Sequence, residues 1–292
     1  QLATNCYALK EDTRGDRYYE AAYQIEKLTE PLTTRLPLKQ IPGVGDSISD
    51  KIVEMVYTGK SAYLDNMEHD KLLQQRLELL SVAGIGPNTC DKLLRLGITS
   101  LADLRALDST TVGKSTDNTD RPFVPTAAQH LALEHHDDLL LRIPRSEINK
   151  LEKYLLKNLK SESESESESE SESESETHRK LQRSAPPFTI VGSYRRGAST
   201  SGDIDVLLVD TTIDHFVDTL SQHPKYKVAG TLSRGGTKAS LLVKLDKYVR
   251  RVDILTVPAS EYAPALMYFT GSKCFNVRIR SIAKELGFVL NE

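Results

Sequence analysis

The sequence predicts a protein with a helical N-terminal half and an α+β C-terminal half. A Gly-x-Gly turn followed by a helical pattern occurs twice in the N-terminal third, at residues 41–52 and 82–93. Farther along, a polar, glycine-bounded turn leads into the β-branched run 204–209, which is typical of a loop feeding a strand. Between them, residues 161–176 are a pure Ser-Glu repeat without an apolar residue, so we expect this tract to be disordered. A chain of 292 residues is long enough for several domains with separate cores.

Composition excludes some classes of protein. No apolar run reaches the length of a membrane span and no secretory segment opens the chain, which predicts a soluble intracellular protein. Cys6, Cys90 and Cys274 are far apart and lack the spacing of metal ligands, so we expect free thiols. Because the chain begins with Gln1 rather than Met and ends within a helical pattern, we expect a fragment at both ends.

The charge is unevenly distributed along the chain. The formal net charge is −3, but the Ser-Glu repeat alone carries eight glutamates. Residues 178–292 hold 17 Lys and Arg against 10 Asp and Glu. This excess favours a polyanionic partner, such as nucleic acid or nucleotide, for the C-terminal half.

The N-terminal third predicts helices joined by two similar turns. Residues 1–38 place apolar side chains at helical spacing. Each glycine turn then opens a helix, and Pro87 after the second turn is a good helix-start signal. Backbone N–H groups at such a turn can bind a phosphate. One Gly-x-Gly is a weak signal that an ordinary helical hairpin also gives, but the duplication favours a pair of phosphate-binding hairpins.

The middle of the chain predicts a loop and two helices. Residues 108–122 are polar and rich in turn formers, and a helix carrying His135 and His136 follows. His135, His136 and Asp137 suggest a metal site, but adjacent residues on a helix face different directions, so we favour a surface interpretation. A second, amphipathic helix is expected to begin at Ser146 or a neighbouring residue. Its inward face consists of Ile148, Leu151, Leu155 and Leu159.

The stretch 192–209 carries the residues best suited to chemistry. Asp203 and Asp205 lie two apart at the start of the predicted strand. Both carboxylates therefore point to one face, while Ile204, Val206 and Leu208 point to the other, toward a core. Adjacent carboxylates repel each other unless a cation lies between them, and hard oxygen ligands suit Mg²⁺ or Mn²⁺. Residues upstream can hold the phosphates that such a metal bridges: Ser193, Arg196, Ser201 and Gly202.

A helix and three strands are expected after this stretch. They are the helix 213–223 and the strands 227–232, 240–245 and 248–257. Asp253 lies among the apolar residues of the last strand, as a buried carboxylate would, and a buried charge requires compensation. Arg251, two residues earlier on the same face, is placed to orient it.

At these residues the sequence resembles a known family. Gly-Ser-Tyr-Arg-Arg-Gly at 192–197, followed by Ser-Gly-Asp-Ile-Asp-Val-Leu-Leu at 201–208, resembles the palm signature of the family X DNA polymerases, nearest the beta and lambda types. The wider nucleotidyltransferase superfamily shares only a looser Gly-Ser and Asp-x-Asp. The resemblance implies that Asp203, Asp205 and Asp253 are catalytic and bind the metal. It also implies that these residues bind the incoming nucleotide: Arg142, Ser193, Arg196, Ser201, Gly202, Tyr268, Phe269, Gly271 and Asn276.

The resemblance extends over most of the chain. The two glycine turns are similar to paired helix-hairpin-helix motifs, which grip the DNA backbone without reading sequence. It implies DNA contacts at Tyr23, Gly43, Gly45, Gly84, Gly86, Arg251 and Arg280. It also implies four parts: a lyase-like domain at 1–79, a DNA-binding subdomain at 80–145, a palm at 146–257 interrupted by the repeat, and the start of a nucleotide-selection (thumb) subdomain at 258–292.

Lys51 matches the position of the family's Schiff-base lysine, which removes a 5′-deoxyribose phosphate by β-elimination. A lysine forms a Schiff base only through its neutral amine, which burial or nearby positive charge populates. Where the family usually has basic phosphate-binding residues, this chain has Tyr19, Ser47 and Tyr63, although Tyr23 and Lys60 remain. Two interpretations of Lys51 therefore remain: it is the nucleophile of a lyase, or it is an ordinary solvated lysine on a helix.

The expected protein joins an all-α helix-hairpin-helix half to an α+β nucleotidyltransferase palm. The resemblance implies a monomeric DNA-directed DNA polymerase, nuclear in a eukaryote, that acts on gapped or nicked double-stranded DNA with deoxynucleoside triphosphates and Mg²⁺ or Mn²⁺, in base excision repair or end joining.

Two other functions are considered. One is a template-independent terminal transferase, disfavoured by the short turn 233–238 and by Tyr268-Phe269, where transferases usually carry Trp-Gly. The other is a non-catalytic DNA-end-binding module, because the thumb is incomplete. The Ser-Glu repeat is compatible with an interaction tail, a phosphorylation tract or a neutral expansion.

Overall fold

The computed structural model describes residues 1–32, 37–107, 123–159 and 185–290. The chain divides into two compact units, Gln1–Leu133 and Glu134–Glu292. The predicted loop at 108–122 and the Ser-Glu repeat at 161–176 lie outside the described residues. None of the helices in the described ranges is both long enough and apolar enough to cross a membrane.

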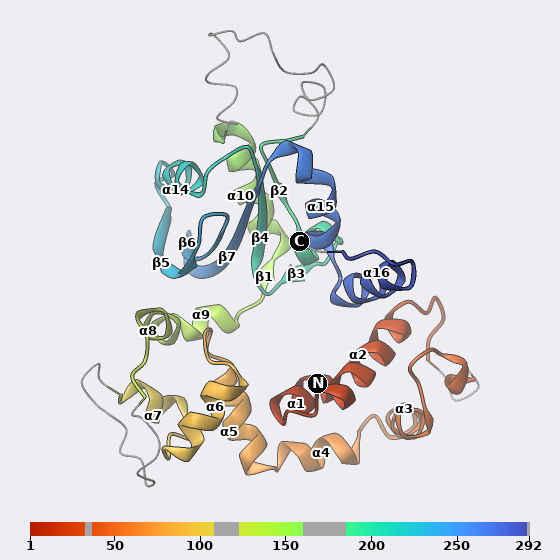
Figure 1. Cartoon of the computed structure of the whole chain (residues 1–292). Coiled ribbons are helices and arrows are strands. Elements are labelled where there is room, and N and C mark those ends of the chain that lie inside the picture. Colours follow the sequence, from red (N-terminus) through yellow and green to blue (C-terminus); the bar gives the residue numbers. More distant parts are fainter. Residues whose placement is uncertain (33–36, 108–122, 160–184, 291–292) are drawn as a thin grey trace, which may run out of the picture. The chain divides into compact units, whose positions relative to one another are not determined.

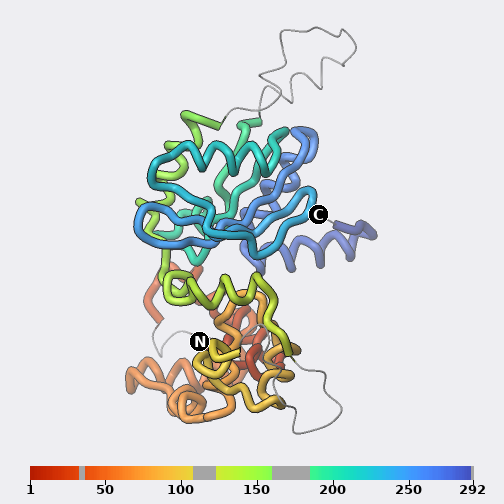
Figure 2. The backbone as a smooth tube through the Cα atoms, turned by 90° about the vertical axis from the view of Figure 1, so that its left-hand side faces the viewer, coloured from red at the N-terminus to blue at the C-terminus, as the bar shows by residue number. Residues whose placement is uncertain are grey.

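The N-terminal unit is helical, as predicted, and Figure 2 traces its short helices in red to yellow-green. Side chains of Ser61, Asp70 and Ser100 cap helices α4, α5 and α7 by accepting backbone N–H bonds, which explains why these helices begin where they do. The elements are α1 (Leu2–Ala8), α2 (Asp12–Glu26), η1 (Leu38–Gln40), α3 (Asp46–Thr58), α4 (Ala62–Glu68), α5 (Lys71–Leu80), α6 (Pro87–Arg95), α7 (Leu101–Arg105) and α8 (Ala127–Glu134).

A buried arginine of α5 joins the end of α1 to α6, the helix that follows the second glycine turn. Arg76 of α5 donates from Nε to the carbonyl of Ala8 at 2.5 Å and pairs with Asp91 of α6. Asp91 also pairs with Lys10. Side-chain contacts therefore cross the domain boundary predicted between residues 79 and 80. This boundary and those predicted at 145/146 and 257/258 remain predictions.

The C-terminal unit is built on a five-stranded sheet in the order β2-β4-β7-β6-β5. The central strands β4 and β7 run parallel and the other pairs are antiparallel. A separate two-stranded ribbon joins β1 to β3. The strands are β1 (Ile143–Pro144), β2 (Phe188–Ile190), β3 (Thr200–Ser201), β4 (Ile204–Val209), β5 (Tyr226–Arg234), β6 (Lys238–Leu245) and β7 (Tyr248–Val257).

Helices cover both faces of this sheet (Figure 1). On one face, α10 (Arg145–Asn158) and α14 (Ile213–Ser221) pack on alternate residues of β4, namely Ile204, Val206 and Leu208. On the other, α15 (Tyr262–Thr270) packs on Leu207, Leu255 and Val257. A central parallel strand buried on both faces has a continuous apolar run, which in β4 is Val206–Val209. The predicted helical half and α+β palm are both confirmed.

Some elements differ from the predicted bounds. Strands β5 and β6 are longer than expected because the hairpin between them is closed by only a short turn, and two register shifts in β5 interrupt its alternation. The helix predicted to follow residue 123 is broken at His135 into α8 and α9 (His136–Leu140). The remaining elements are α13 (Gly192–Arg195), η2 (Ala259–Glu261) and α16 (Lys273–Glu285).

Candidate metal centre and its surroundings

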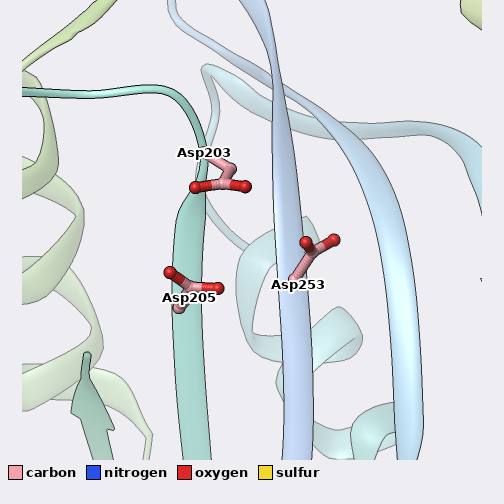
Figure 3. Close-up of side chains that lie close together, drawn as sticks. All are labelled: Asp203, Asp205 and Asp253. Atoms are coloured by element: carbon pink, nitrogen blue, oxygen red, sulfur yellow. The ribbon is translucent and has the colours of Figure 1, made fainter. Parts of the chain in front are cut away.

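Three carboxylates from two neighbouring strands converge at one end of the sheet. Asp205 of β4 lies directly opposite Asp253 of β7 in the parallel register, and Asp203 directly precedes β4. Each offers an oxygen atom, and these atoms all lie within 4.8 Å of one another. Figure 3 shows Asp203 where the chain enters β4, Asp205 on β4 and Asp253 on the neighbouring strand β7. Clustered carboxylate oxygens are the ligands that divalent cations such as Mg²⁺ and Mn²⁺ prefer.

The charge of this cluster is incompletely compensated by the protein. Burial, followed by the charges of Asp203 and Asp253, raises the pKa of Asp205 to about 7. Arg251 pairs with Asp203, and its Nε lies 3.3 Å from Oδ2 of Asp253. Burial disfavours the charged form of Arg251 and lowers its pKa. The neighbouring carboxylates outweigh this effect, so the pKa of Arg251 is raised overall. One guanidinium among three carboxylates leaves a negative charge that a bound cation would neutralise, so these residues fit a divalent metal.

Ser240 is a member of the cluster that sequence reasoning missed. Its Oγ donates to Oδ1 of Asp253 at 2.5 Å, because Ser240 of β6 is the direct partner of Asp253 in the antiparallel pairing with β7. The only signal in the sequence was a hydroxyl next to the apolar run Leu241–Val243. Finding its partner requires the register of two strands, which the sequence does not specify locally.

Gly192 allows the turn before β4 to approach Asp205. It adopts φ +57°, and a Cβ at this position would overlap the Asp205 carboxylate. The backbone N–H of Val191 donates to the carbonyl of Asp205 at 2.9 Å. Only glycine combines this left-handed conformation with such a close approach, which explains why the motif begins with it.

The predicted phosphate-binding hydroxyls and glycine lie together beside the ribbon β1–β3. Oγ of Ser193 donates to Oγ of Ser201 at 2.8 Å, and Ser201 is buried. Arg142 donates from Nη2 to the carbonyl of Thr200 at 2.7 Å. A Cβ at Gly202 would lie 3.2 Å from Nη1 of Arg142, so the absence of a side chain there leaves room for the guanidinium.

Arg196 connects this turn to the end of α15. Its Nη1 donates to the carbonyl of Thr270 at 2.6 Å. Gly271 follows with φ +69°, and a Cβ there would lie 3.3 Å from the same nitrogen. The structure thus brings Arg196 and Gly271, which are far apart in sequence, into contact.

The segment predicted to select the nucleotide surrounds a cavity of about 540 Å³ lined by Tyr268, Phe269, Asn276 and Arg280, among others. The Tyr268 and Phe269 rings pack edge to face with centroids 5.0 Å apart. Nδ2 of Asn276 donates to the carbonyl of Tyr268 at 2.8 Å, and the Arg280 guanidinium lies 5.0 Å from the Tyr268 ring centroid. The cavity is therefore bounded by aromatic faces and by polar groups from α16.

The two glycine turns of the N-terminal unit have nearly the same geometry. Gly43 and Gly84 adopt φ +83° and +86°, and Gly45 and Gly86 are both extended residues that cap the following helix. In each turn one backbone bond of 3.0 Å closes the loop, from Val44 to Ile41 and from Ile85 to Val82. The two turns that are similar in sequence therefore also have similar backbone conformations.

Lys51 lies on α3, one turn after Ser47. Its Nζ donates to Oγ of Ser47 at 2.8 Å and lies 4.7 Å from the centroid of the Tyr63 ring. Tyr23 lies on α2, where the ammonium of Lys27 is 3.8 Å from its ring centroid. Two of the three residues that replace the family's usual basic positions, Ser47 and Tyr63, thus contact the candidate nucleophile directly.

Comparison with known protein families matches the chain in four segments. Residues 2–61 match a helix-hairpin-helix domain and residues 76–117 a SAM-like helix-hairpin-helix tandem. Residues 142–259 match the DNA polymerase beta palm, and residues 265–292 match the DNA polymerase beta thumb.

Known proteins similar to the chain include three polymerases. DNA polymerase lambda of Arabidopsis thaliana is 29% identical over 308 aligned residues, which cover 98% of this chain and 50% of that protein. DNA polymerase lambda of Rattus norvegicus is 28% identical, covering 96% of this chain and 46% of the relative. DNA-directed DNA/RNA polymerase mu of Homo sapiens is 22% identical, covering 94% and 56%. The chain thus spans about half the length of these relatives.

Proposed function

Because the chain belongs to the family X DNA polymerases, we propose that it fills short gaps in double-stranded DNA by transferring nucleotidyl groups from deoxynucleoside triphosphates to a primer 3′-hydroxyl. The observation that carries this proposal is the cluster of Asp203, Asp205 and Asp253 beside the Gly192 turn. Such a reaction needs one site that holds both a metal and a triphosphate.

The three carboxylates would hold Mg²⁺ or Mn²⁺ in this proposal. When bound, such ions lower the pKa of the attacking hydroxyl and neutralise the charge of the triphosphate. Arg251 keeps Asp203 and Asp253 in place, and the hydroxyl of Ser240 orients Asp253. The protein thus presents ligands whose directions are set before a metal arrives.

The incoming nucleotide would lie between the Gly192 turn and the end of α15. Ser193, Ser201 and Gly202 offer short polar contacts to phosphate oxygens, and the guanidinium groups of Arg142 and Arg196 suit bidentate binding of phosphates. The remaining proposed contacts are with the sugar, from Tyr268, Phe269 and Gly271, with the base, from Asn276, and with the template strand, from Arg280.

The DNA duplex would be held chiefly through its phosphates. The turns at Gly43–Gly45 and Gly84–Gly86 leave backbone N–H groups available for this, without reading base sequence. Tyr23 and Arg251 are proposed as further DNA contacts. The four parts that we propose keep the predicted bounds of 1–79, 80–145, 146–257 and 258–292.

A gap-filling assay tests the proposal. The purified chain is given a labelled primer on DNA with a one-nucleotide gap, Mg²⁺ and each deoxynucleoside triphosphate in turn, with excess chelator as the control. We expect extension by the templated nucleotide only. Extension of a single strand without a template would instead support a terminal transferase. DNA binding without extension in Mg²⁺ or Mn²⁺ would support a DNA-end-binding module.

Template dependence is preferred because of one feature of the palm. The β5–β6 hairpin is closed by residues 235–237 alone, so no long loop is available there to take the place of a template strand.

We also propose a monomer, a role in base excision repair or end joining, and a nuclear location in a eukaryotic cell. Removal of a 5′-deoxyribose phosphate through Lys51 is a second proposed activity.

A further inference from the structure

Arg145, the first residue of α10, holds both ends of the turn that follows Gly192. Its Nη1 donates to the carbonyl of Tyr194 at 2.6 Å and lies 3.3 Å from the carbonyl of Ala198. Its backbone N–H donates to the carbonyl of Ser199 at 2.9 Å. One residue of α10 therefore fastens the end of the short helix α13 and the start of β3 at once.

The ring of Tyr194 is fixed by the same helix. The Arg145 guanidinium carbon lies 4.1 Å from its centroid, and only 7% of Tyr194 is exposed. Its hydroxyl lies 2.7 Å from Oδ1 of Asn149 and 2.5 Å from Oε2 of Glu152, both on α10. Burial, followed by the bond to Glu152, raises the pKa of Tyr194 to about 12, so the hydroxyl remains a proton donor. The ring and the backbone carbonyl of Tyr194 are thus each held by α10.

This arrangement bears on the two residues nearest to Tyr194 in the proposed nucleotide site. Ser193 precedes it and Arg196 follows two positions later, so the direction of both side chains depends on the backbone that Arg145 holds. Ser193 and Arg196 each make one further contact, to Ser201 and to the carbonyl of Thr270. Groups that bind a triphosphate are effective only if they are held in place before the ligand arrives.

We propose that Arg145 and Tyr194 are positioning residues for the triphosphate of the incoming nucleotide. They contact no substrate; they hold the Gly192 turn against α10, so that Ser193 and Arg196 bind phosphate without first being ordered. The proposal rests on the polymerase function proposed above. Charge-assisted bonds from one guanidinium to two carbonyls, and the stacking of that planar group on a ring, are features that lysine does not reproduce.

The test uses the full chain and the variants Arg145→Met, Arg145→Lys and Tyr194→Phe. Single-nucleotide gap filling gives kcat and the KM for the deoxynucleoside triphosphate, and fluorescence anisotropy gives the Kd for gapped DNA. Calorimetry with a triphosphate analogue that cannot be cleaved between its α and β phosphorus atoms measures nucleotide binding without activity. We expect Arg145→Met to raise the KM and the analogue Kd about tenfold or more, with Arg145→Lys and Tyr194→Phe giving smaller increases. The Kd for gapped DNA should stay within about twofold.

Tyr154→Phe is the matched control. Tyr154 is also on α10, and its hydroxyl donates to a carbonyl, that of Thr219, at 2.7 Å, but it does not contact the Gly192 turn. Its loss should lower the thermal midpoint without raising the KM for nucleotide. If Arg145→Met fails to fold, Tyr194→Phe and Arg145→Lys decide the question. The inference is overturned if all folded variants bind the analogue like the wild type, or if Tyr154→Phe weakens it equally. A wild type that neither extends the primer nor binds the analogue would instead overturn the proposed function.

Discussion

The charge of Asp205 destabilises the fold, and the proposed role of this residue as a metal ligand accounts for that cost. Its carboxylate is partly buried and lies close to those of Asp203 and Asp253, and Arg251 balances only part of their charge. Such a group is retained at the expense of stability where it binds a cation. Removing this charge should therefore lower activity but raise the stability of the metal-free protein.

Removing a carboxylate should abolish catalysis and spare DNA binding. We expect Asp205→Ala and Asp253→Ala to lose gap filling by far more than tenfold, since each removes a proposed metal ligand rather than a phosphate contact. The control is Asp214→Ala, which removes an exposed carboxylate paired with Arg234. A variant that fills gaps within about tenfold of the wild type, about 1.4 kcal/mol of barrier, would contradict the assignment.

The stability of the metal-free protein should depend on pH through Asp205. Its pKa is about 7 in the folded protein and about 3.9 in an unfolded chain, so the folded state binds the proton more tightly. This contribution to stability is full below about pH 4 and is lost as the pH rises through 7. In chelator, the thermal midpoint of the wild type should therefore fall relative to that of Asp205→Asn as the pH rises from 5 to 8. A constant difference across this range would show that Asp205 is not protonated in the folded state.

Lys51 is the residue whose proposed role depends most on its neighbours. We expect weak lyase activity, with a Schiff base that borohydride traps on DNA bearing a 5′-deoxyribose phosphate, and no adduct in Lys51→Ala. Because Nζ of Lys51 contacts Oγ of Ser47, Ser47→Lys places a second cation beside it and should strengthen trapping. Lys39→Ala, which changes an exposed lysine paired with Asp46, is the control. If neither the wild type nor Ser47→Lys forms an adduct, the N-terminal unit serves only to bind DNA.

At the scale of elements, a buried ion pair joins β7 to the start of α10. Arg250 is 3% exposed and donates to both carboxylate oxygens of Glu147, at 2.8 and 3.0 Å. It also donates to the carbonyl of Leu141 at 3.2 Å. The strand that carries Asp253 is thereby fastened to the segment that carries Arg142.

Breaking this pair should destabilise the C-terminal unit. Glu147→Ala leaves a buried guanidinium without its main partner, and we expect a loss of about 2 kcal/mol or more in the free energy of unfolding. The double variant Arg250→Met with Glu147→Leu removes both charges and should recover most of that loss. Urea unfolding followed by circular dichroism measures both. Equal losses in the single and double variants would show that the contacts to carbonyls, rather than the ion pair, carry the stability.

The elements that the sequence predicted are those with a repeating local pattern. Three of the four apolar residues predicted at helical spacing lie on α10 and the fourth, Leu159, caps its C-terminal end; all four are buried as expected. Asp203 and Asp205 share a face because strand side chains alternate. In contrast, β1, β2 and β3 have two or three residues each, too few for any period to appear. The contact of Ser240 with Asp253, and that of Arg145 with the Gly192 turn, depend on pairing between distant segments, which no local pattern encodes.

At the scale of the whole chain, the features proposed to bind DNA belong to both compact units. The glycine turns are in the N-terminal unit, and the carboxylates are in the C-terminal unit, whose residues 178–292 carry an excess of positive charge. Phosphate contacts carry a large share of affinity and weaken as salt rises. The charge of segments inserted between these features should therefore influence DNA binding even where they make no contact.

Deleting the Ser-Glu repeat, residues 161–176, tests this expectation. The core residues on either side, Leu159 and Phe188, belong to one hydrophobic cluster, and the 12 residues that would still join them can reach about 40 Å. We therefore expect the variant to fold and to fill gaps like the wild type. Loss of eight glutamates should tighten DNA binding at low salt, and the difference should shrink as salt screens it.

A Ser-Gln repeat of equal length separates charge from length in this experiment. If the glutamates repel DNA, the Ser-Gln variant should bind like the deletion. If the length of the tract matters instead, it should bind like the wild type. Anisotropy titrations of gapped DNA at about 50 and 200 mM salt, a range over which phosphate contacts weaken markedly, distinguish the two. A deletion variant that unfolds or loses gap filling while the Ser-Gln variant keeps both would show that the tract is a structural part of the palm, because length without charge would then be sufficient.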